Sequence, residues 1–173
     1  LFFDSSSIGW GADVLVTRNR DRDAVASIPV VRELYRDHVV YAKAMLQHLI
    51  RDAMPHIETR FDMSAVIDGK TYEYEGLMDV IVKNTHVFGG EWVLSQDAKA
   101  DDGLFEMVPV SGVLDFSAKL WATLRHNPIS DDEWRMFGVN HSEPVRGAEF
   151  LLTIRHGGEI PPSCQVDGDE WGN

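Results

Sequence analysis

The stretch that decides the fold is residues 58–82, ETRFDMSAVIDGKTYEYEGLMDVIV. β-Branched and aromatic residues dominate both of its halves, which favours two extended strands, over residues 58–66 and 71–82. Between them lies Asp68-Gly69, and both residue types tolerate the positive φ angles of a two-residue hairpin turn. The stretch therefore predicts an antiparallel β-hairpin, and with it a chain built mainly from strands.

The rest of the chain predicts two helices and several further strands. Apolar residues recur every three or four positions over 30–53 and 113–126, which predicts two amphipathic helices. A turn is expected at 9–11, and residues 17–26 are polar without a period, which predicts irregular structure. Further strands are expected at 1–8, 92–94, 104–110, 148–155 and 164–166. Strands joined by short turns predict a mainly β (α+β) fold, an antiparallel β-sandwich with two attached amphipathic helices.

Composition and charge narrow the classes of function. The chain has 173 residues, 44% of them hydrophobic and 25% charged, which excludes wholesale disorder. Its net charge is −12, and residues 55–173 carry all of it. An acidic body repels phosphate backbones, so no nucleic-acid partner is expected, and membrane contact would have to use the near-neutral first third. No apolar run reaches the roughly 20 residues of a transmembrane helix.

Two details concern the compartment and the ends of the chain. The single cysteine, Cys164, excludes an internal disulfide and fits a reducing compartment, so a cytoplasmic location is expected. The chain begins at Leu1 without a methionine or a signal-peptide pattern. We therefore expect it to be a piece of a longer protein.

Two segments near the middle of the chain could carry chemistry. In residues 84–90, NTHVFGG, the paired glycines allow a close approach of the backbone to a ligand, or they simply form a tight loop. In residues 97–104, DAKADDGL, the oxygen-rich side chains suit a hard cation such as Mg²⁺, but the same residues are ordinary turn formers. The second segment is not an EF-hand, because Asp102 and Val108 stand where that loop needs glycine and glutamate. Spacing alone does not decide whether either segment binds a ligand or is an ordinary turn.

A third segment, residues 167–172 with the sequence DGDEWG, has three carboxylates within four residues. Their repulsion raises the proton affinity of any that is partly buried, and such a group could accept the proton of a hydroxyl. The alternative is a solvent-exposed acidic turn. The seven histidines show no HxH or HExxH spacing, so no zinc site is expected.

In order, these segments resemble the C-terminal half of the diacylglycerol kinase-like lipid kinases, the superfamily of bacterial diacylglycerol kinases and sphingosine kinases. The resemblance is carried by SIGWGAD at 7–13, VKN to FGG at 82–90, DAKADDGLFE at 97–106 and QVDG at 165–168. It implies that residues 1–173 form a single β-sandwich domain, and that the family's N-terminal α/β nucleotide-binding domain is absent from this chain. The implied reaction is transfer of the γ-phosphoryl group of ATP to a lipid hydroxyl such as that of diacylglycerol.

Carried over position by position, the resemblance assigns three sets of residues. The implied ligands of a structural Mg²⁺ are the carboxylate of Asp102 and the backbone carbonyls of Lys99 and Leu104. The implied catalytic residues, which receive the proton of the attacking hydroxyl, are Asp167, Asp169 and Glu170. The implied substrate-binding residues are Asn84, Gly89 and Gly90.

The chain departs from the family pattern at two positions. Asp169 stands where the family has glutamate, and Glu170 follows one place later. Aspartate reaches about 1.5 Å less far than glutamate, and a misplacement of about 1 Å can lower a rate on the order of 10²-fold. Either Asp169 acts with a shifted backbone, or Glu170 substitutes for it, or the chain is weakly active. Glu91 replaces the family's third glycine after the aromatic residue.

Two other functions fit the same residues. A non-catalytic β-sandwich module would bind a lipid or a cation without turnover, and a relative of the kinases could act on a soluble hydroxylated substrate. For the kinase, the expected partners are a lipid substrate and ATP, the latter bound mainly by the missing domain, and the expected cofactor is Mg²⁺. Peripheral contact with a membrane and formation of a homodimer are left open by the sequence.

Overall fold

The computed structural model describes residues 4–25, 60–88, 92–94, 98–124, 136, 142–158, 161–167 and 169–171. The elements are β1 (Ser5–Gly9), α1 (Trp10–Val25), β2 (Phe61–Ile67), β3 (Lys70–Leu77), β4 (Asp79–Lys83), β5 (Val87–Phe88), β6 (Trp92–Val93), β7 (Phe105–Val110), α4 (Val113–Leu124), β8 (Val145–Gly147), β9 (Phe150–His156), β10 (Cys164–Val166) and β11 (Asp169–Trp171). All paired strands in these ranges are antiparallel. The mainly β fold expected from the sequence is confirmed.

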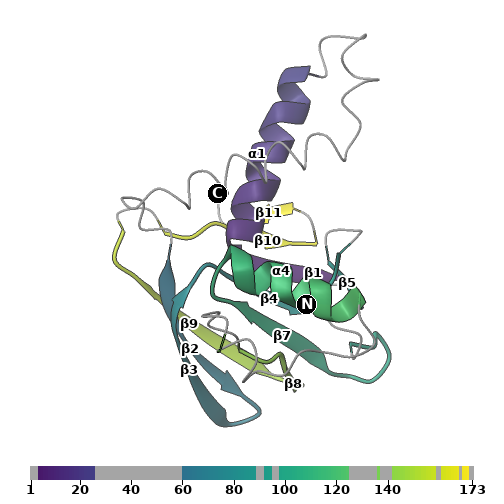
Figure 1. The fold of residues 1–173 in the computed structure, drawn as a ribbon, viewed down its shortest axis with the longest axis vertical. Helices are drawn as coiled ribbons and strands as arrows, with labels where there is room; N and C mark the ends of the chain where they lie inside the picture. Colours follow the sequence, from purple (N-terminus) through teal and green to yellow (C-terminus); the bar gives the residue numbers. More distant parts are fainter. Residues whose placement is uncertain are drawn as a thin grey trace.

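The strands form two sheets and a short ribbon. The larger sheet has the order β11-β10-β1-β4-β7-β8, the smaller has the order β3-β2-β9, and β5 pairs with β6. One face of the larger sheet packs against the smaller sheet, and α1 and α4 contribute to the core on its other face (Figure 1). The sandwich prediction is thus confirmed, with the six-stranded sheet as the middle layer.

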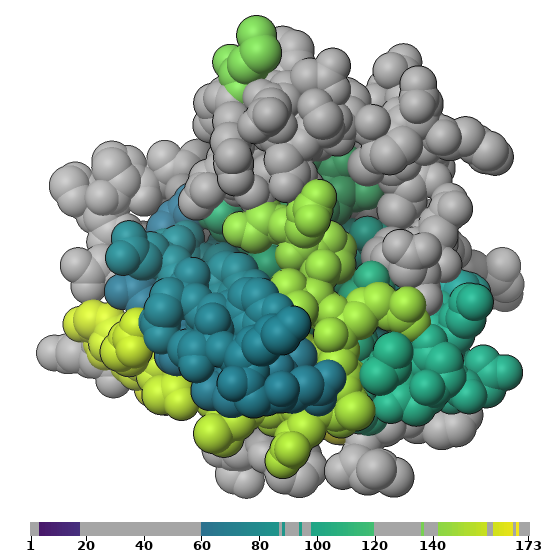
Figure 2. All heavy atoms as spheres, turned by 90° about the horizontal axis from the view of Figure 1, so that it is seen from below, coloured from purple at the N-terminus to yellow at the C-terminus, as the bar shows by residue number. Residues whose placement is uncertain are grey.

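The central strand β4 shows why the middle layer is apolar on both faces. Val80 and Val82 pack with Met107 toward the smaller sheet, whereas Ile81 packs with Trp10 on the helix side. A strand covered on both faces has a continuous apolar run instead of an alternating pattern. The smaller sheet is different, because the β2–β3 hairpin and residues 142–158 spread over the outer surface seen in Figure 2. Along β2 buried residues alternate with half-buried ones, and along most of β3 and β9 half-buried residues alternate with exposed ones.

The hairpin forms as expected. Asp68 and Gly69 have φ angles of 48° and 79° and join β2 to β3. The strand expected over 71–82, however, is two strands in different sheets, β3 and β4. Near the end of β3, Gly76 has a φ of 62° where the pairing with β2 is irregular, and its N–H donates to the Asp62 carboxylate at 2.9 Å. A single residue, Met78, then separates β3 from β4, and the apolar pattern alone does not reveal that the chain passes from one sheet to the other there.

The helices agree with the sequence only in part. The helix expected over 113–126 is confirmed as α4, while the one expected over 30–53 lies outside the described residues. The prediction of a turn at 9–11 and irregular structure at 17–26 is wrong for the described residues, because α1 begins directly after β1. Its first turns bury Ala12 and Val14 in the core, whereas its far end extends beyond the sheets (Figure 1). Residues 18–23 of the helix are all polar or charged in the sequence, so no apolar period marks its whole length.

Candidate active site

The segments with candidate residues share one end of the six-stranded sheet. Because neighbouring strands are antiparallel, the beginnings of β1 and β7 and the ends of β4 and β10 meet there. The register defines a row across this end: Ser5 lies opposite Lys83, Lys83 opposite Glu106, and Glu106 opposite Arg146. Segments far apart in the sequence are therefore placed at the same edge.

The two acidic segments are nevertheless separate. The Asp167 turn follows β10 and the Asp102 bend precedes β7, and two strands, β1 and β4, lie between β10 and β7. Neighbouring strands are about 4.8 Å apart, so the two segments are separated by roughly 14 Å. They lie at one end of the sheet, but they do not form one binding site.

The acidic turn is fixed to β1. Asp167 has a φ of 51° and follows the end of β10. One of its carboxylate oxygens, Oδ1, accepts hydrogen bonds from the backbone N–H groups of Asp4 at 2.7 Å and Ser5 at 3.2 Å. The N–H of Asp167 donates in turn to the carbonyl of Ser5 at 2.7 Å. Asp167 thus holds the turn in place, a role that the sequence did not suggest.

The other two acidic residues lie on strand β11, which the sequence did not predict. Asp169 is exposed and lies opposite Val166 of β10, and Glu170 lies opposite Gln165. The side chain of Glu170 is outside the described part of the structure. Asp169 is therefore an exposed carboxylate directly beside a turn that is anchored to the sheet.

The carboxylate of Asp102 is engaged on both oxygens. Oδ1 accepts the backbone N–H of Leu104 at 2.9 Å, as in an ordinary Asx turn. Oδ2 accepts a hydrogen bond from the guanidinium of Arg146, which belongs to the edge strand β8 and is partly exposed. Arg146 was not singled out from the sequence, because 44 residues separate it from Asp102.

These contacts bear on the expected Mg²⁺ ligands. A guanidinium already neutralises Asp102, and a cation at Oδ2 would have to displace it or share the oxygen. Within the described ranges no cluster of three or more histidine, cysteine, aspartate or glutamate residues could hold a metal ion. A metal at Asp102 would therefore have to compete with Arg146, and the assignment of Asp102, Lys99 and Leu104 stays a prediction.

The candidate substrate-binding segment begins directly after β4. The N–H of Asn84 donates to the carbonyl of Asp4 at 2.9 Å, and the hydroxyl of Thr85 donates to the Asp4 carboxylate at 2.5 Å. These contacts tie the segment to the beginning of β1. Gly89 and Gly90 lie outside the described residues, so their role stays a prediction.

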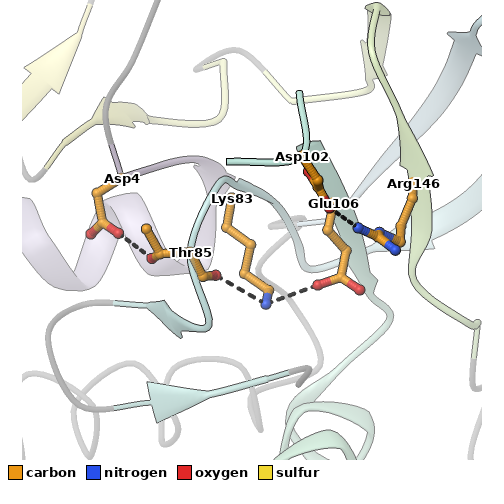
Figure 3. A network of polar contacts seen from close by, with 6 residues as sticks. All are labelled: Asp4, Lys83, Thr85, Asp102, Glu106 and Arg146. Atoms are coloured by element: carbon orange, nitrogen blue, oxygen red, sulfur yellow. Dashed lines mark hydrogen bonds and ion pairs between the residues drawn. The ribbon is translucent and has the colours of Figure 1, made fainter. Parts of the chain in front are cut away.

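A buried ion pair occupies the middle of the row (Figure 3). The Lys83 ammonium lies 2.8 Å from the Glu106 carboxylate, and the two side chains are 0% and 3% exposed. Lys83 also donates to the carbonyl of Thr85 at 3.3 Å. The signal in the sequence was a charged residue within each of two otherwise apolar strand segments, VIVK and FEMVPV. Sequence reasoning used both residues only as part of a motif.

A second buried carboxylate lies at the other end of β4. Asp79 is 1% exposed and accepts the N–H of Gly11, at the beginning of α1, at 2.8 Å. Burial raises the pKa of Asp79 to about 8, although the hydrogen bonds from Gly11 and Val80 act in the opposite direction. Its Oδ1 atom and the indole N–H of Trp10 have no hydrogen-bond partner among the described residues. Asp79 was not singled out from the sequence either.

The comparisons with known proteins concern the fold. No family model and no curated protein matches the chain. Two solved structures from Bacillus anthracis strain Sterne, both assigned as diacylglycerol kinases, are similar to it. The first has a TM-score of 0.56 and 18% sequence identity, and the match covers 97% of this chain and 45% of the other. The second has a TM-score of 0.51 and 15% sequence identity, and the match covers 98% of this chain and 43% of the other.

This chain has the fold of diacylglycerol kinase-like proteins. The resemblance inferred from four sequence segments is confirmed at the level of the fold. The chain spans less than half the length of either solved structure. Neither α1 nor α4, the helices in the described part of the chain, is long and apolar enough to span a bilayer.

Proposed function

We propose that the chain forms the lipid-binding half of an ATP-dependent kinase that phosphorylates a lipid hydroxyl, such as that of diacylglycerol. The fold of diacylglycerol kinase-like proteins supports this proposal. The observation that carries it is the placement of an exposed carboxylate, Asp169, beside an anchored turn at the same end of the sheet as Asn84. A hydroxyl acceptor and its proton acceptor would meet at this end.

In the proposed reaction the hydroxyl oxygen attacks the γ-phosphorus of ATP. The new P–O bond forms while the bond to the bridging oxygen of the β-phosphate breaks, and ADP leaves with that oxygen. The hydroxyl proton passes to a carboxylate, for which we propose Asp169 because Asp167 is bonded to β1. Asp167 orients the turn, and Glu170, the next residue of β11, is the alternative proton acceptor.

The nucleotide would be held mainly by an α/β domain of the longer protein. Mg²⁺ bound to the ATP phosphates would neutralise charge that the acidic residues at this end would otherwise repel. The lipid would be reached by peripheral contact with the cytoplasmic face of a membrane, and the acyl chains would need an apolar surface. A homodimer is compatible with this proposal but is not required by it.

The test is transfer of labelled phosphate from ATP by the full-length protein. We expect a phosphorylated product from diacylglycerol in mixed micelles or vesicles, and little product from a short soluble alcohol such as glycerol. Turnover of glycerol without micelles would favour a soluble substrate instead. A folded protein that binds lipid vesicles but phosphorylates none of a panel of diacylglycerol, sphingosine and ceramide would contradict the kinase and favour a binding module.

A further inference from the structure

The Lys83–Glu106 pair is placed where stability alone does not explain it. Both side chains are buried on the helix-side face of the central strands β4 and β7, and their charged atoms lie 2.8 Å apart. Removing two charges from water has a large desolvation penalty, and apolar residues of similar volume often make a protein equally stable or more stable. The pair therefore calls for an explanation in terms of what it contacts.

Its contacts lead to the acidic turn in three steps. Lys83 donates to the carbonyl of Thr85, which holds the bend after β4. The Thr85 hydroxyl donates to the carboxylate of Asp4, and the N–H of Asp4 donates to the carboxylate of Asp167. Figure 3 shows the first part of this series, with Lys83 between Glu106 and Thr85 and with Asp4 beyond Thr85.

Burial also excludes one direct role. The Lys83 side chain is 0% exposed, so its ammonium has no access to a phosphate or a lipid headgroup at the surface. Any effect of Lys83 on a reaction at this end of the sheet must pass through the groups that it holds. Among the described residues, these groups include the bend at Thr85 and, through it, the turn that begins at Asp167.

We propose that Lys83 and Glu106 are positioning residues, which set the place of the acidic turn through Thr85 and Asp4. This inference rests on the proposed function, since it assigns the positioned turn to the acceptor hydroxyl. The pair fixes the end of β4, Thr85 transmits that position to β1, and Asp167 fixes the turn that precedes Asp169. An ion pair suits this role because its strength depends on direction and distance, unlike the contact of two apolar side chains.

The test measures, in the full-length protein, whether the ion pair affects the stability of the fold or the position of the acidic turn. The double variant Lys83→Met/Glu106→Leu replaces the pair by apolar residues of similar volume and leaves no unpaired buried charge. We expect its melting temperature to stay within a few degrees of the parent. We expect amide exchange at Asp4 and Ser5 to become at least 10-fold faster, and kcat to fall by about 10- to 100-fold with little change in the KM for ATP.

Substitutions at Thr85 test the connection between the ion pair and the acidic turn without changing the ion pair itself. Thr85→Val removes the hydroxyl while leaving Lys83 and Glu106 in place, and it should also speed exchange at Asp4 and lower kcat. Thr85→Ser keeps the hydroxyl and should restore both values. Thr153→Val, at an exposed position on β9 of the other sheet, is the matched control and should change neither.

The outcomes decide the inference. Unchanged exchange at Asp4 and Ser5 in a folded double variant would overturn it, and so would a loss of kcat that only follows the unfolded fraction. If the double variant does not fold, Thr85→Val decides, and parental exchange in that variant would overturn the inference. If the parent phosphorylates no lipid, the proposed function fails, while the exchange measurements still show whether the pair positions the turn.

Discussion

Two carboxylates are buried on the same face of the six-stranded sheet, and they are accommodated differently. Glu106 forms an ion pair with Lys83, at the end of β4 that carries the candidate active site. Asp79 lies at the other end of β4, has no cationic partner among the described residues, and has its pKa raised to about 8 by burial. A buried carboxylate either pairs with a cation or takes up a proton. Of these two strand carboxylates, Glu106 is paired at the candidate active end, and Asp79 takes up a proton at the opposite end.

The largest effect is expected from the pH dependence of Asp79. Its pKa in the folded protein, about 8, is above the ordinary value of 3.8, so its contribution to stability is fully present below about pH 4 and is lost as the pH rises through about 8. Asp79→Asn removes this dependence. The free energy of unfolding of the variant, relative to the parent, should rise by on the order of 5 kcal/mol from pH 4 to pH 9. Urea denaturation at several pH values measures it, and a constant difference would show that Asp79 does not take up a proton on folding.

Breaking the ion pair from one side should have the next largest effect. Lys83→Met leaves the Glu106 carboxylate buried without its ammonium partner, so we expect a loss of about 4 kcal/mol in the free energy of unfolding. The double variant Lys83→Met/Glu106→Leu should recover most of this loss. If the single and double variants were equally destabilised, the Glu106 carboxylate would not be left buried and unpaired in the single variant. The contrast between a paired Glu106 and a protonated Asp79 would then fail.

The contact that holds Asp79 at the beginning of α1 can also be broken. A Cβ atom at Gly11 would lie 2.6 Å from Oδ2 of Asp79 and 3.2 Å from the hydroxyl of Ser7. Gly11→Ala should therefore lower stability by about 2 kcal/mol, although alanine favours a helix. Ser117→Ala, at an exposed position of α4, is the matched control and should not destabilise. A Gly11→Ala variant as stable as the parent would show that the carboxylate can move away.

The smallest effect is expected at the surface. Arg146→Met removes the cationic partner of Asp102 and should lower stability by about 0.5 kcal/mol, since the pair is partly exposed. With the carboxylate released, Mg²⁺ should raise the melting temperature of this variant more than that of the parent. Arg155→Met, which breaks the exposed pair with Glu73, is the control. If EDTA destabilises the parent but not Asp102→Asn, a divalent cation, and not Arg146, holds this bend.

The features that could be predicted from the sequence are those that depend on residues close together in the chain. Asp68-Gly69 marked the hairpin because a turn is a local choice of φ angles. The three-residue strands β8 and β11 are too short to show a sequence pattern. They are strands because they pair with β7 and β10. Likewise the segments around Asp102 and Asp167 could be found as motifs, but their partners Arg146 and Asp4 are distant in the sequence. Which charges are buried depended on the strand order, which no local pattern contains.

The central claim is that Asp169 accepts the proton of a lipid hydroxyl during phosphoryl transfer from ATP. The most direct measurement is kcat for diacylglycerol phosphorylation by the full-length protein and three variants. We predict that Asp169→Asn lowers kcat by on the order of 10²-fold or more, that Asp169→Glu retains turnover, and that Glu143→Gln, at an exposed carboxylate outside the acidic turn, matches the parent. Parental turnover by a folded Asp169→Asn would contradict the claim.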